Sequence, residues 1–201
     1  LRKNALSPGT LSLERHRLLW LYLNRRTNLL NSKLKVLHIA PEQIFYKKFK
    51  NNMKWDYTTF DLKSPLADIK GDVTNLTFEN NTFDLIICNH VLEHIIDDRT
   101  AMKEIYRVLK KDGIGILQVP IDKSLEKTYE DNTLVSKRQR AKNFGQYDHV
   151  RKYGIDYKDR LENTGFSVNL IDYTNEFEDN LISKYGLIKG ELIPIVKKSI
   201  S

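Results

Sequence analysis

The stretch Val36-Leu37-His38-Ile39-Ala40-Pro41-Glu42 decides the fold, because it predicts a buried strand that runs directly into the start of a helix. Nucleotide-binding α/β domains usually have glycines at such a turn, and this stretch has none. Pro41 lacks an amide hydrogen and is expected as the first helical residue, Ala40 and Glu42 are expected to resist a positive φ, and the Glu42 carboxylate would repel phosphate. The turn therefore disfavours a pyrophosphate ligand.

Apolar patches alternate with helical patterns from Lys35 onward, which predicts βα units and an α/β fold with a mostly parallel sheet. The predicted strands cover residues 35–40, 55–61, 68–72, 83–88, 113–120, 166–173 and 191–197.

Three helices are predicted around these strands. One covers residues 12–30 with Ser12 as its cap, and another covers about 155–164 and ends at Gly165. The third begins at Asp97 or Asp98 and ends before Gly113. Its apolar stripe is formed by Ala101, Ile105, Val108 and Leu109.

The domain organisation follows from these elements. Residues 1–33 are expected to form a helical segment that packs on the site or covers it, and residues 34–201 to form the main domain. Within that domain, residues 121–153 lack a clear period and are too long for an ordinary connection, which indicates a functional insert.

Composition narrows the functional classes only a little. The 201 residues include 33 Lys+Arg and 26 Asp+Glu, a net charge of +7 that weakly favours anionic partners. The single cysteine, Cys88, cannot form an internal disulfide and is expected in the core, and no apolar run is long enough for a membrane span. A cytoplasmic location is the resulting expectation.

Acidic residues follow two of the predicted strands. Asp61 closes the second strand, and its spacing from Glu42 suits a carboxylate that accepts hydrogen bonds from ribose hydroxyls. The alternative, that Asp61 only caps the strand, is given equal weight. Asp72 follows the third strand and either accepts from an adenine amino group, with Val73 on the ring, or is a plain loop acid. S-adenosylmethionine fits this pattern because it carries an adenosine, a sulfonium and no phosphate.

The chain from Lys35 to about Gly165 resembles a class I S-adenosylmethionine-dependent methyltransferase of the type-11 methyltransferase domain family. The resemblance is carried by the opening stretch, by Asp61, and by Gly71-Asp72-Val73 with Leu76-Thr77-Phe78. Its most specific part continues through Phe83-Asp84-Leu85-Ile86-Ile87-Cys88-Asn89-His90-Val91-Leu92-Glu93-His94 and Arg107-Val108-Leu109-Lys110-Lys111-Asp112-Gly113.

This resemblance implies a Rossmann-like fold with a seven-stranded, mostly parallel sheet, an antiparallel last strand and helices on both faces. It implies S-adenosylmethionine as cofactor, with Asp61 at the ribose, Asp72 at the adenine, and Ala40 and Asn89 at the methionine part. The full set of expected cofactor-binding residues is His38, Ala40, Pro41, Glu42, Asp61, Leu62, Asp72, Val73, Asn89 and His90.

The chain departs from the family pattern at three positions. The family usually has an acid at the position of His38 and glycines at the positions of Ala40 and Glu42. Our hypothesis is that Glu42 supplies the missing acid from the loop and contacts the ammonium of the cofactor.

The acceptor side is expected at the end of the insert. There, His149 is a candidate base, Asp148 an acid that orients it, and Arg151 a forked donor for a carboxylate or phosphate. A polar turn that satisfies its own backbone is an equally weighted alternative. His90 and His94 have a spacing that could hold a metal on a helix, but we predict no metal site.

The predicted function is methyl transfer to a small molecule or glycan precursor. The expected partner is therefore a small-molecule or saccharide substrate, which can be either anionic or neutral. The alternatives are a catalytically altered binding protein and, less favoured, a nicotinamide-dependent enzyme. No nucleic acid is expected, because Asn-His-Val-Leu follows the fourth strand in place of the Asn/Asp-Pro-Pro-aromatic motif that grips a flipped base.

Overall fold

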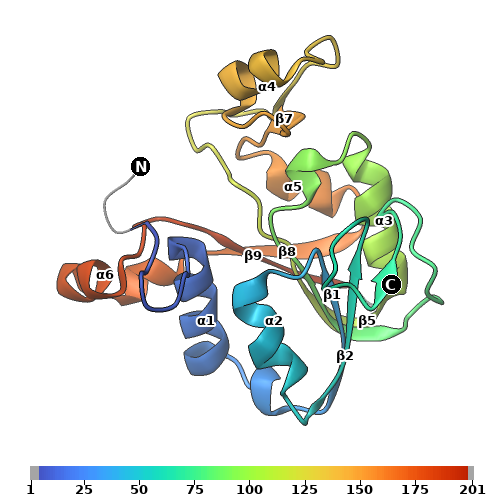
Figure 1. Ribbon diagram of the computed structural model, residues 1–201, viewed down its shortest axis with the longest axis vertical. Coiled ribbons are helices and arrows are strands. Elements are labelled where there is room, and N and C mark those ends of the chain that lie inside the picture. Colours follow the sequence, from blue (N-terminus) through green and yellow to red (C-terminus); the bar gives the residue numbers. More distant parts are fainter. Residues whose placement is uncertain (1–4, 199–201) are drawn as a thin grey trace.

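The computed structural model describes residues 5–198, which fold around one seven-stranded sheet with the strand order β3-β2-β1-β4-β5-β9-β8 (Figure 1). The sequence-predicted α/β fold and its seven sheet strands are therefore confirmed. The strands are β1 (Leu34–Ile39), β2 (Trp55–Asp61), β3 (Ile69–Lys70), β4 (Phe83–Cys88), β5 (Leu109–Ile116), β8 (Phe166–Ile171) and β9 (Ile193–Lys198).

Strand β1 pairs in parallel with both β2 and β4, so the chain passes to opposite sides of β1 in turn. The carboxyl ends of these strands consequently open a crevice at one edge of the sheet, which is where α/β domains bind ligands. Strand β9 is antiparallel to β5 and to β8, in agreement with the expected antiparallel last strand.

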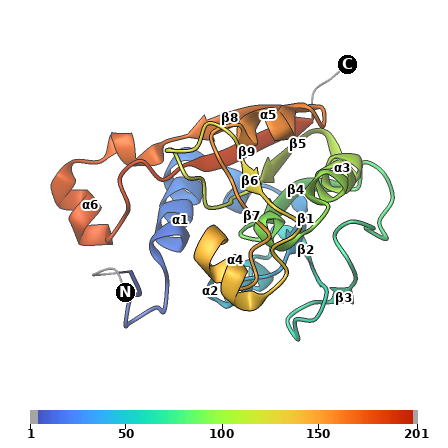
Figure 2. The same ribbon diagram turned by 90° about the horizontal axis from the view of Figure 1, so that it is seen from above.

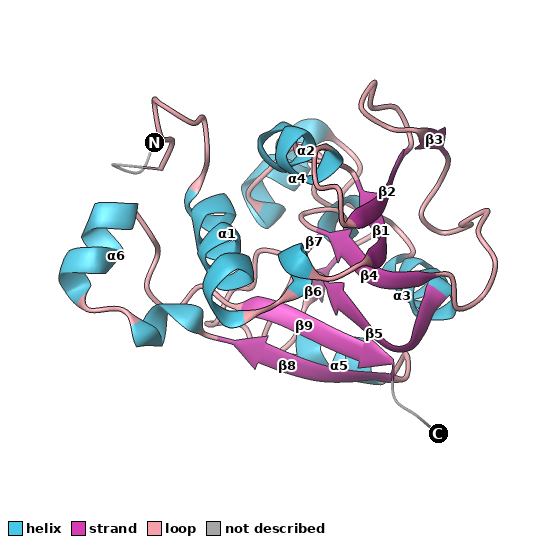
Figure 3. Ribbon diagram, turned by 90° about the horizontal axis from the view of Figure 1, so that it is seen from below, coloured by secondary structure: helices cyan, strands magenta, loops and turns pink. Residues whose placement is uncertain are grey.

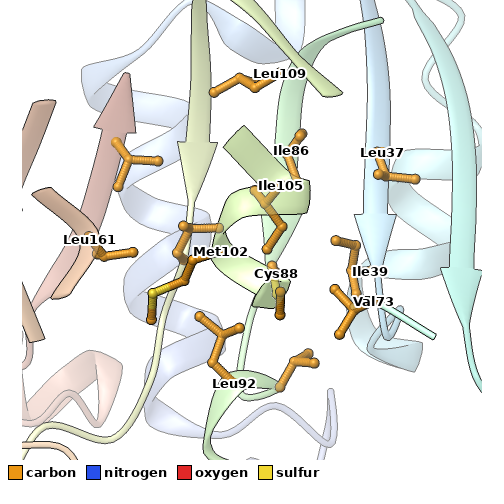
Figure 4. Close-up of a cluster of buried hydrophobic side chains, with 14 of the residues drawn as sticks. Leu37, Ile39, Val73, Ile86, Cys88, Leu92, Met102, Ile105, Leu109 and Leu161 are labelled. Carbon is orange, nitrogen blue, oxygen red and sulfur yellow. The ribbon is translucent and has the colours of Figure 1, made fainter. Parts of the chain in front are cut away.

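Alternate residues of the central strands supply two hydrophobic cores, one on each face of the sheet. Figure 3 shows that helices cover both faces. Val36 faces α1 (Glu14–Arg26) and α2 (Gln43–Lys50), while Leu37 and Ile39 face the side covered by α3 (Asp98–Val108) and α5 (Tyr157–Glu162). Figure 4 shows Leu37, Ile86 and Cys88 of the sheet beside Met102 and Ile105 of α3.

The remaining helices are short. They are α4 (Lys137–Phe144), α6 (Asp179–Tyr185) and the 3-10 turns η1 (Leu29–Asn31), η2 (Leu92–His94) and η3 (Tyr173–Glu176). Arg17 of α1 ties the C-terminal part to the leading helix, because its guanidinium donates to the carbonyls of Tyr185 and Gly186 at 2.6 Å each. None of the helices in residues 5–198 combines the length and the apolar character that crossing a membrane requires.

All three predicted helices form, with shifted ends; α5 covers Tyr157–Glu162 instead of about 155–164. Asp97 caps α3 as expected, with its side chain accepting from the backbone N–H of Thr100 at 3.0 Å. The leading helix α1 is shorter than predicted: it begins after Leu13 rather than after Ser12 and ends at Arg26. Its inward face nevertheless packs on the sheet through Leu18, Leu19 and Leu23.

The start of β5 differs from the prediction because no loop separates it from α3. The helix ends at Val108, and β5 begins at Leu109 instead of Gly113. Its register against β4 then jumps from the pair Phe83↔Leu109 to Leu85↔Ile114, which marks a bulge. Gly113 belongs to this bulge, where a Cβ would lie 2.9 Å from the carbonyl oxygen of Lys110.

The predicted insert is ordered by a small hairpin-like pairing. Strand β6 (Tyr129–Glu130) pairs with β7 (Arg151–Lys152), and α4 lies between them in the chain. The insert lies above the strand ends (Figure 1), with α4 on the side of the sheet that α2 covers (Figure 2). Arg151 fastens the insert to the segment that follows β4 by donating to the carbonyls of Leu92, Ile95 and Ile96.

The turn between β1 and α2 contains a residue with a positive φ, a backbone conformation that glycine usually adopts. Ala40 has a φ of 50°, so the expectation that it resists a positive φ is wrong, while Glu42 has an ordinary φ of −74°. The backbone N–H of Ala40 donates to the carbonyl of Phe60 at 2.8 Å, which fixes the turn to the end of β2. Pro41 lies before the helix rather than in it, because α2 begins at Gln43 with Glu42 as its N-cap.

We predict that Ala40→Gly raises the free energy of unfolding by about 1 kcal/mol, because it removes the left-handed strain of a residue with a Cβ. Ala101→Gly is the matched control: Ala101 is a buried residue inside α3, so this change should lower stability by about 1 kcal/mol or more. Urea unfolding of both variants measures the difference. If Ala40→Gly lost as much stability as Ala101→Gly, the conclusion that the backbone of Ala40 is strained would be contradicted.

Candidate active site

The first of two cavities, here called the smaller cavity, lies at the carboxyl ends of β1 and β2 and has a volume of about 220 Å³. It gathers six of the residues that the sequence assigns to the cofactor, together with apolar neighbours from the same loops. The six are Ala40, Asp61, Leu62, Asp72, Val73 and His90.

The second, larger cavity has a volume of about 660 Å³ and lies under the insert. Its walls come from the segment after β5, the end of the insert, the start of α1 and the loop before β9. His90 borders both cavities, so the two meet at this residue. His90 also has a φ of 54°, and its backbone N–H donates to the carbonyl of Gln118 at 2.7 Å.

Asp61 and Asp72 each use one carboxylate oxygen to hold their own loop. Oδ1 of Asp61 accepts from the backbone N–H groups of Lys63 and Ser64, at 2.7 and 2.6 Å. Oδ1 of Asp72 accepts from the backbone N–H and hydroxyl of Thr74, at 2.9 and 2.8 Å. Within residues 5–198 no hydrogen bond reaches either Oδ2, so each side chain keeps an acceptor for a ligand.

Glu42 connects the leading helix to the end of β4. His16 Nδ1 accepts from the backbone N–H of Leu13 at 3.1 Å, which leaves the proton on Nε2, and Nε2 donates to Glu42 Oε1 at 2.5 Å. Arg15 Nη2 lies 3.5 Å from the same oxygen, and Asn89 Nδ2 lies 3.4 Å from Oε2. The loop carboxylate thus has partners on two elements that are distant in sequence.

These partners keep Glu42 ionised. Burial by itself would raise the pKa of this carboxyl, but the hydrogen bond from His16 and the nearby Arg15 outweigh it and lower the pKa to about 2. The side chain is 15% exposed, so its charge is screened only in part. A negative charge therefore stands beside the turn where a phosphate ligand would have to bind.

His38 lies away from both cavities. Its side chain is 0% exposed, packs against Phe49, and shares a hydrogen bond of 2.7 Å between its Nδ1 and the hydroxyl of Tyr57. Burial lowers its pKa to about 4, against the opposing effect of Glu42, so the ring is neutral near pH 7. The position at which the family has an acid is therefore a neutral core residue in this chain.

Three other predicted cofactor residues, Pro41, Glu42 and Asn89, are not part of the wall of the smaller cavity. Asn89 is 3% exposed, and its Oδ1 is buried without a hydrogen-bond partner. A buried oxygen of this kind is costly unless a donor reaches it. It is suited to accept from a cation such as the ammonium of an amino acid moiety.

The structure brings Asp148, His149 and Arg151 to the end of the insert, but in different environments. His149 borders the larger cavity, and burial lowers its pKa in spite of the opposing effect of Glu93. Asp148 is partly exposed and lies beside His94, with Oδ2 at 3.5 Å from Nδ1. Arg151 is buried, and its donors are engaged by backbone carbonyls and by Glu130, so a forked contact with a substrate would require these bonds to break.

Sequence reasoning missed two sets of contacts. The sequence assigns neither His16 nor Arg15 to the site, although both contact Glu42. The chain separates His16 from Glu42 by 26 residues and offers no local signal for the contact. Glu93 was treated as part of a family motif, yet it holds His90 through a 3.1 Å contact between Oε1 and Nδ1. Its spacing of three residues from His90 could have indicated this pair.

Comparisons with known proteins find similarity to methyltransferases. The family model described as "Methyltransferase domain" matches residues 24–117. The demethylmenaquinone methyltransferase of Staphylococcus haemolyticus is 29% identical over 112 residues, which are 49% of this chain and 47% of that protein. The chain thus spans less than half the length of the curated relatives it matches.

Solved structures show the same fold at low sequence identity. The 1,6-didemethyltoxoflavin-N1-methyltransferase of Burkholderia thailandensis, solved with S-adenosylhomocysteine, has a TM-score of 0.59 and 16% identity, covering 93% of this chain and 78% of that one. The [4+2]-cyclase SpnF has a TM-score of 0.64 and 13% identity, covering 100% of this chain and 86% of that one.

Residues 24–117 thus match a methyltransferase domain, and the solved structures confirm the expected Rossmann-like fold. The family match and the neighbour with S-adenosylhomocysteine also support the prediction of S-adenosylmethionine as cofactor. The residues fit this molecule, because the free oxygens of Asp61 and Asp72 suit an adenosine and the unpartnered Asn89 Oδ1 suits an ammonium.

We predict that the stability gained from Glu42 depends on pH. Because its folded-state pKa is lowered from 4.5 to about 2, the stabilisation is complete above pH 4.5 and is lost as the pH falls toward 2. The stability difference between the wild type and Glu42→Gln should therefore shrink by about 2 kcal/mol between pH 7 and pH 3.

Urea unfolding at several pH values measures this difference. Glu162→Gln provides the control, since Glu162 forms an exposed ion pair with Lys158 on α5, and such a pair contributes little to stability. An effect of Glu42→Gln that is the same at pH 7 and pH 3 would contradict the ionised, hydrogen-bonded carboxylate.

Proposed function

We propose that this protein is an S-adenosylmethionine-dependent methyltransferase that acts on a small molecule or a glycan precursor. The observation that carries the proposal is the smaller cavity, where Asp61 and Asp72 offer free carboxylate oxygens beside a turn without a phosphate cradle. An adenosine that bears a sulfonium in place of phosphates satisfies both features.

In this proposal the cofactor lies along the ends of β1, β2 and β4. Asp61 Oδ2 accepts from the ribose hydroxyls, and Asp72 Oδ2 accepts from the adenine amino group beside Val73 and Leu62. The methionine end extends past Ala40 toward Asn89 and His90. Glu42 keeps its hypothesised role next to the ammonium, supported by its charge and by its contact with Asn89.

The acceptor occupies the larger cavity and meets the methyl group near His90, where the two cavities join. Methyl transfer needs mainly alignment of the acceptor atom with the sulfonium. The cavity lining combines cations (Arg15, Lys123, Lys152, Lys189) with the acids Glu14, Asp122 and Glu191, which supports a polar acceptor. Two of the similar proteins are named for small-molecule substrates, demethylmenaquinone and a toxoflavin precursor.

A catalytically altered protein is the second candidate. Ala40, Glu42 and His38 replace the family's glycines and acid, and the similar fold of a protein titled a [4+2]-cyclase indicates that this scaffold serves other reactions. A cytoplasmic location also remains our proposal, supported only by the single, buried and unpaired Cys88.

Calorimetric titration tests the proposed cofactor. We expect S-adenosylhomocysteine to bind one site per chain, and reduced nicotinamide dinucleotide to bind neither directly nor in competition. Absence of adenosine-ligand binding would favour the altered protein, and tight binding of the dinucleotide would favour the nicotinamide enzyme.

Asp72→Asn should weaken S-adenosylhomocysteine binding about tenfold, because the new amide cannot accept at the Oδ2 position while the loop bond to Thr74 is kept. Asp131→Asn is the matched control. Asp131 makes the same pair of bonds to Thr133 in the insert, away from the cavity. Equal affinity of Asp72→Asn and wild type would remove Asp72 from the site.

His149→Ala should bind S-adenosylhomocysteine as tightly as the wild type but lose methyl transfer, because His149 borders the larger cavity, where the acceptor is proposed to bind, and not the smaller one. Transfer of a radiolabelled methyl group into a small-molecule extract measures this loss. Retained transfer in the variant would exclude His149 from the reaction.

A further inference from the structure

Three side chains converge at the junction of the two cavities. Glu93 and His94 come from η2, directly after β4, and His149 comes from the end of the insert. Their possible ligand atoms all lie within 4.8 Å of one another. His94 borders the smaller cavity and His149 the larger one, so the cluster stands between the two.

Glu93 has one carboxylate oxygen without a partner. Its side chain is 1% exposed, and Oε1 is held by His90 Nδ1 at 3.1 Å, while Oε2 is buried and has no hydrogen bond. Leaving a carboxylate oxygen in a buried place without a donor or a cation is costly. The free oxygen therefore indicates that a positive ligand belongs in this position.

His94 presents the arrangement that metal-bound imidazoles have, and His149 lies against it. His94 Nδ1 lies 3.3 Å from the carbonyl oxygen of Asp148 and 3.5 Å from its Oδ2, so Nδ1 carries the proton and Nε2 keeps a lone pair. An outer carboxylate or carbonyl on the second nitrogen is typical of histidine ligands. His149, 5% exposed, packs edge-on against the His94 ring at 4.8 Å.

We propose that Glu93, His94 and His149 bind a divalent first-row transition ion, for which Zn²⁺ is the reference. One carboxylate and two imidazoles are ligands that Zn²⁺ accepts, and three protein ligands leave one position open. Tetrahedral binding needs ligand atoms about 3.3 Å apart, so the cluster has to contract by about 1.5 Å through side-chain rotation. His90 orients Glu93 from outside the ligand set.

The open position faces the junction of the cavities, and its use in catalysis rests on the proposed function. A hydroxyl of the acceptor binds the ion and loses its proton to water more readily. The oxygen then attacks the methyl carbon: an oxygen–carbon bond forms, the sulfur–carbon bond breaks, and its electron pair neutralises the sulfonium. In this sequence His149 holds the ion instead of taking the proton itself.

The sequence predicts no metal site, because among the histidines only His90 and His94 have a spacing that suggests a pair of metal ligands. In the structure His90 is outside the cluster, and His149 reaches it from across the insert. The third ligand could not be found from local spacing.

Zinc binding by the full chain without a histidine tag tests the proposal. After removal of metals with a chelator, Zn²⁺ titration should give one equivalent per chain, and Co²⁺ should give the visible absorption of a four-coordinate site. His94→Ala and His149→Ala should each weaken Zn²⁺ binding by at least about tenfold. His16→Ala is the control, since His16 lies in α1 outside the cluster and should leave zinc binding unchanged.

Absence of stoichiometric Zn²⁺ binding by the wild type would overturn the proposal, as would unchanged affinity in a folded His94→Ala. His94 is partly exposed, so this variant decides the question even where His149→Ala fails to fold, and circular dichroism checks both. The titration contains no cofactor and no acceptor. Its failure is therefore separate from a failure to bind S-adenosylhomocysteine.

Discussion

The parallel pairing of β1 with both β2 and β4 is the constraint on which the rest of the site depends. It brings together the residues that follow these strands, with Ala40 after β1, Asp61 at the end of β2 and His90 after β4. The left-handed backbone of Ala40 and of His90 lets the chain turn away from the sheet there. A ligand cavity therefore opens at the strand ends without glycines in the first loop.

Glu42 places a negative charge beside the turn that follows β1. Because His16 and Arg15 keep its carboxylate ionised, the turn disfavours a phosphate and tolerates a cation. The same carboxylate joins α1 to the loop, so the leading helix packs against the turn that follows β1. His38, where the family has an acid, is by contrast a neutral residue of the core.

The parts predicted well from the sequence are those fixed by local patterns. The alternation of apolar residues located the strands. Asp61 and Asp72, which line the smaller cavity, were predicted there because they lie at or just after the ends of strands in a parallel sheet. Strand parity could also have placed His38 on the same face as Val36, away from the cavity. Long-range contacts could not be predicted from the sequence. No residue near His16 indicates its contact with Glu42, and no residue near His94 indicates its contact with Asp148, which is 54 residues away.

The most direct test of the central claim is a crystal structure of the chain with S-adenosylhomocysteine. The account predicts that the ribose lies on Asp61, the adenine lies between Asp72 and Val73, and the amino acid end points past Ala40 toward Asn89. An adenosine bound elsewhere, or a smaller cavity that stays empty at saturating ligand, would contradict it.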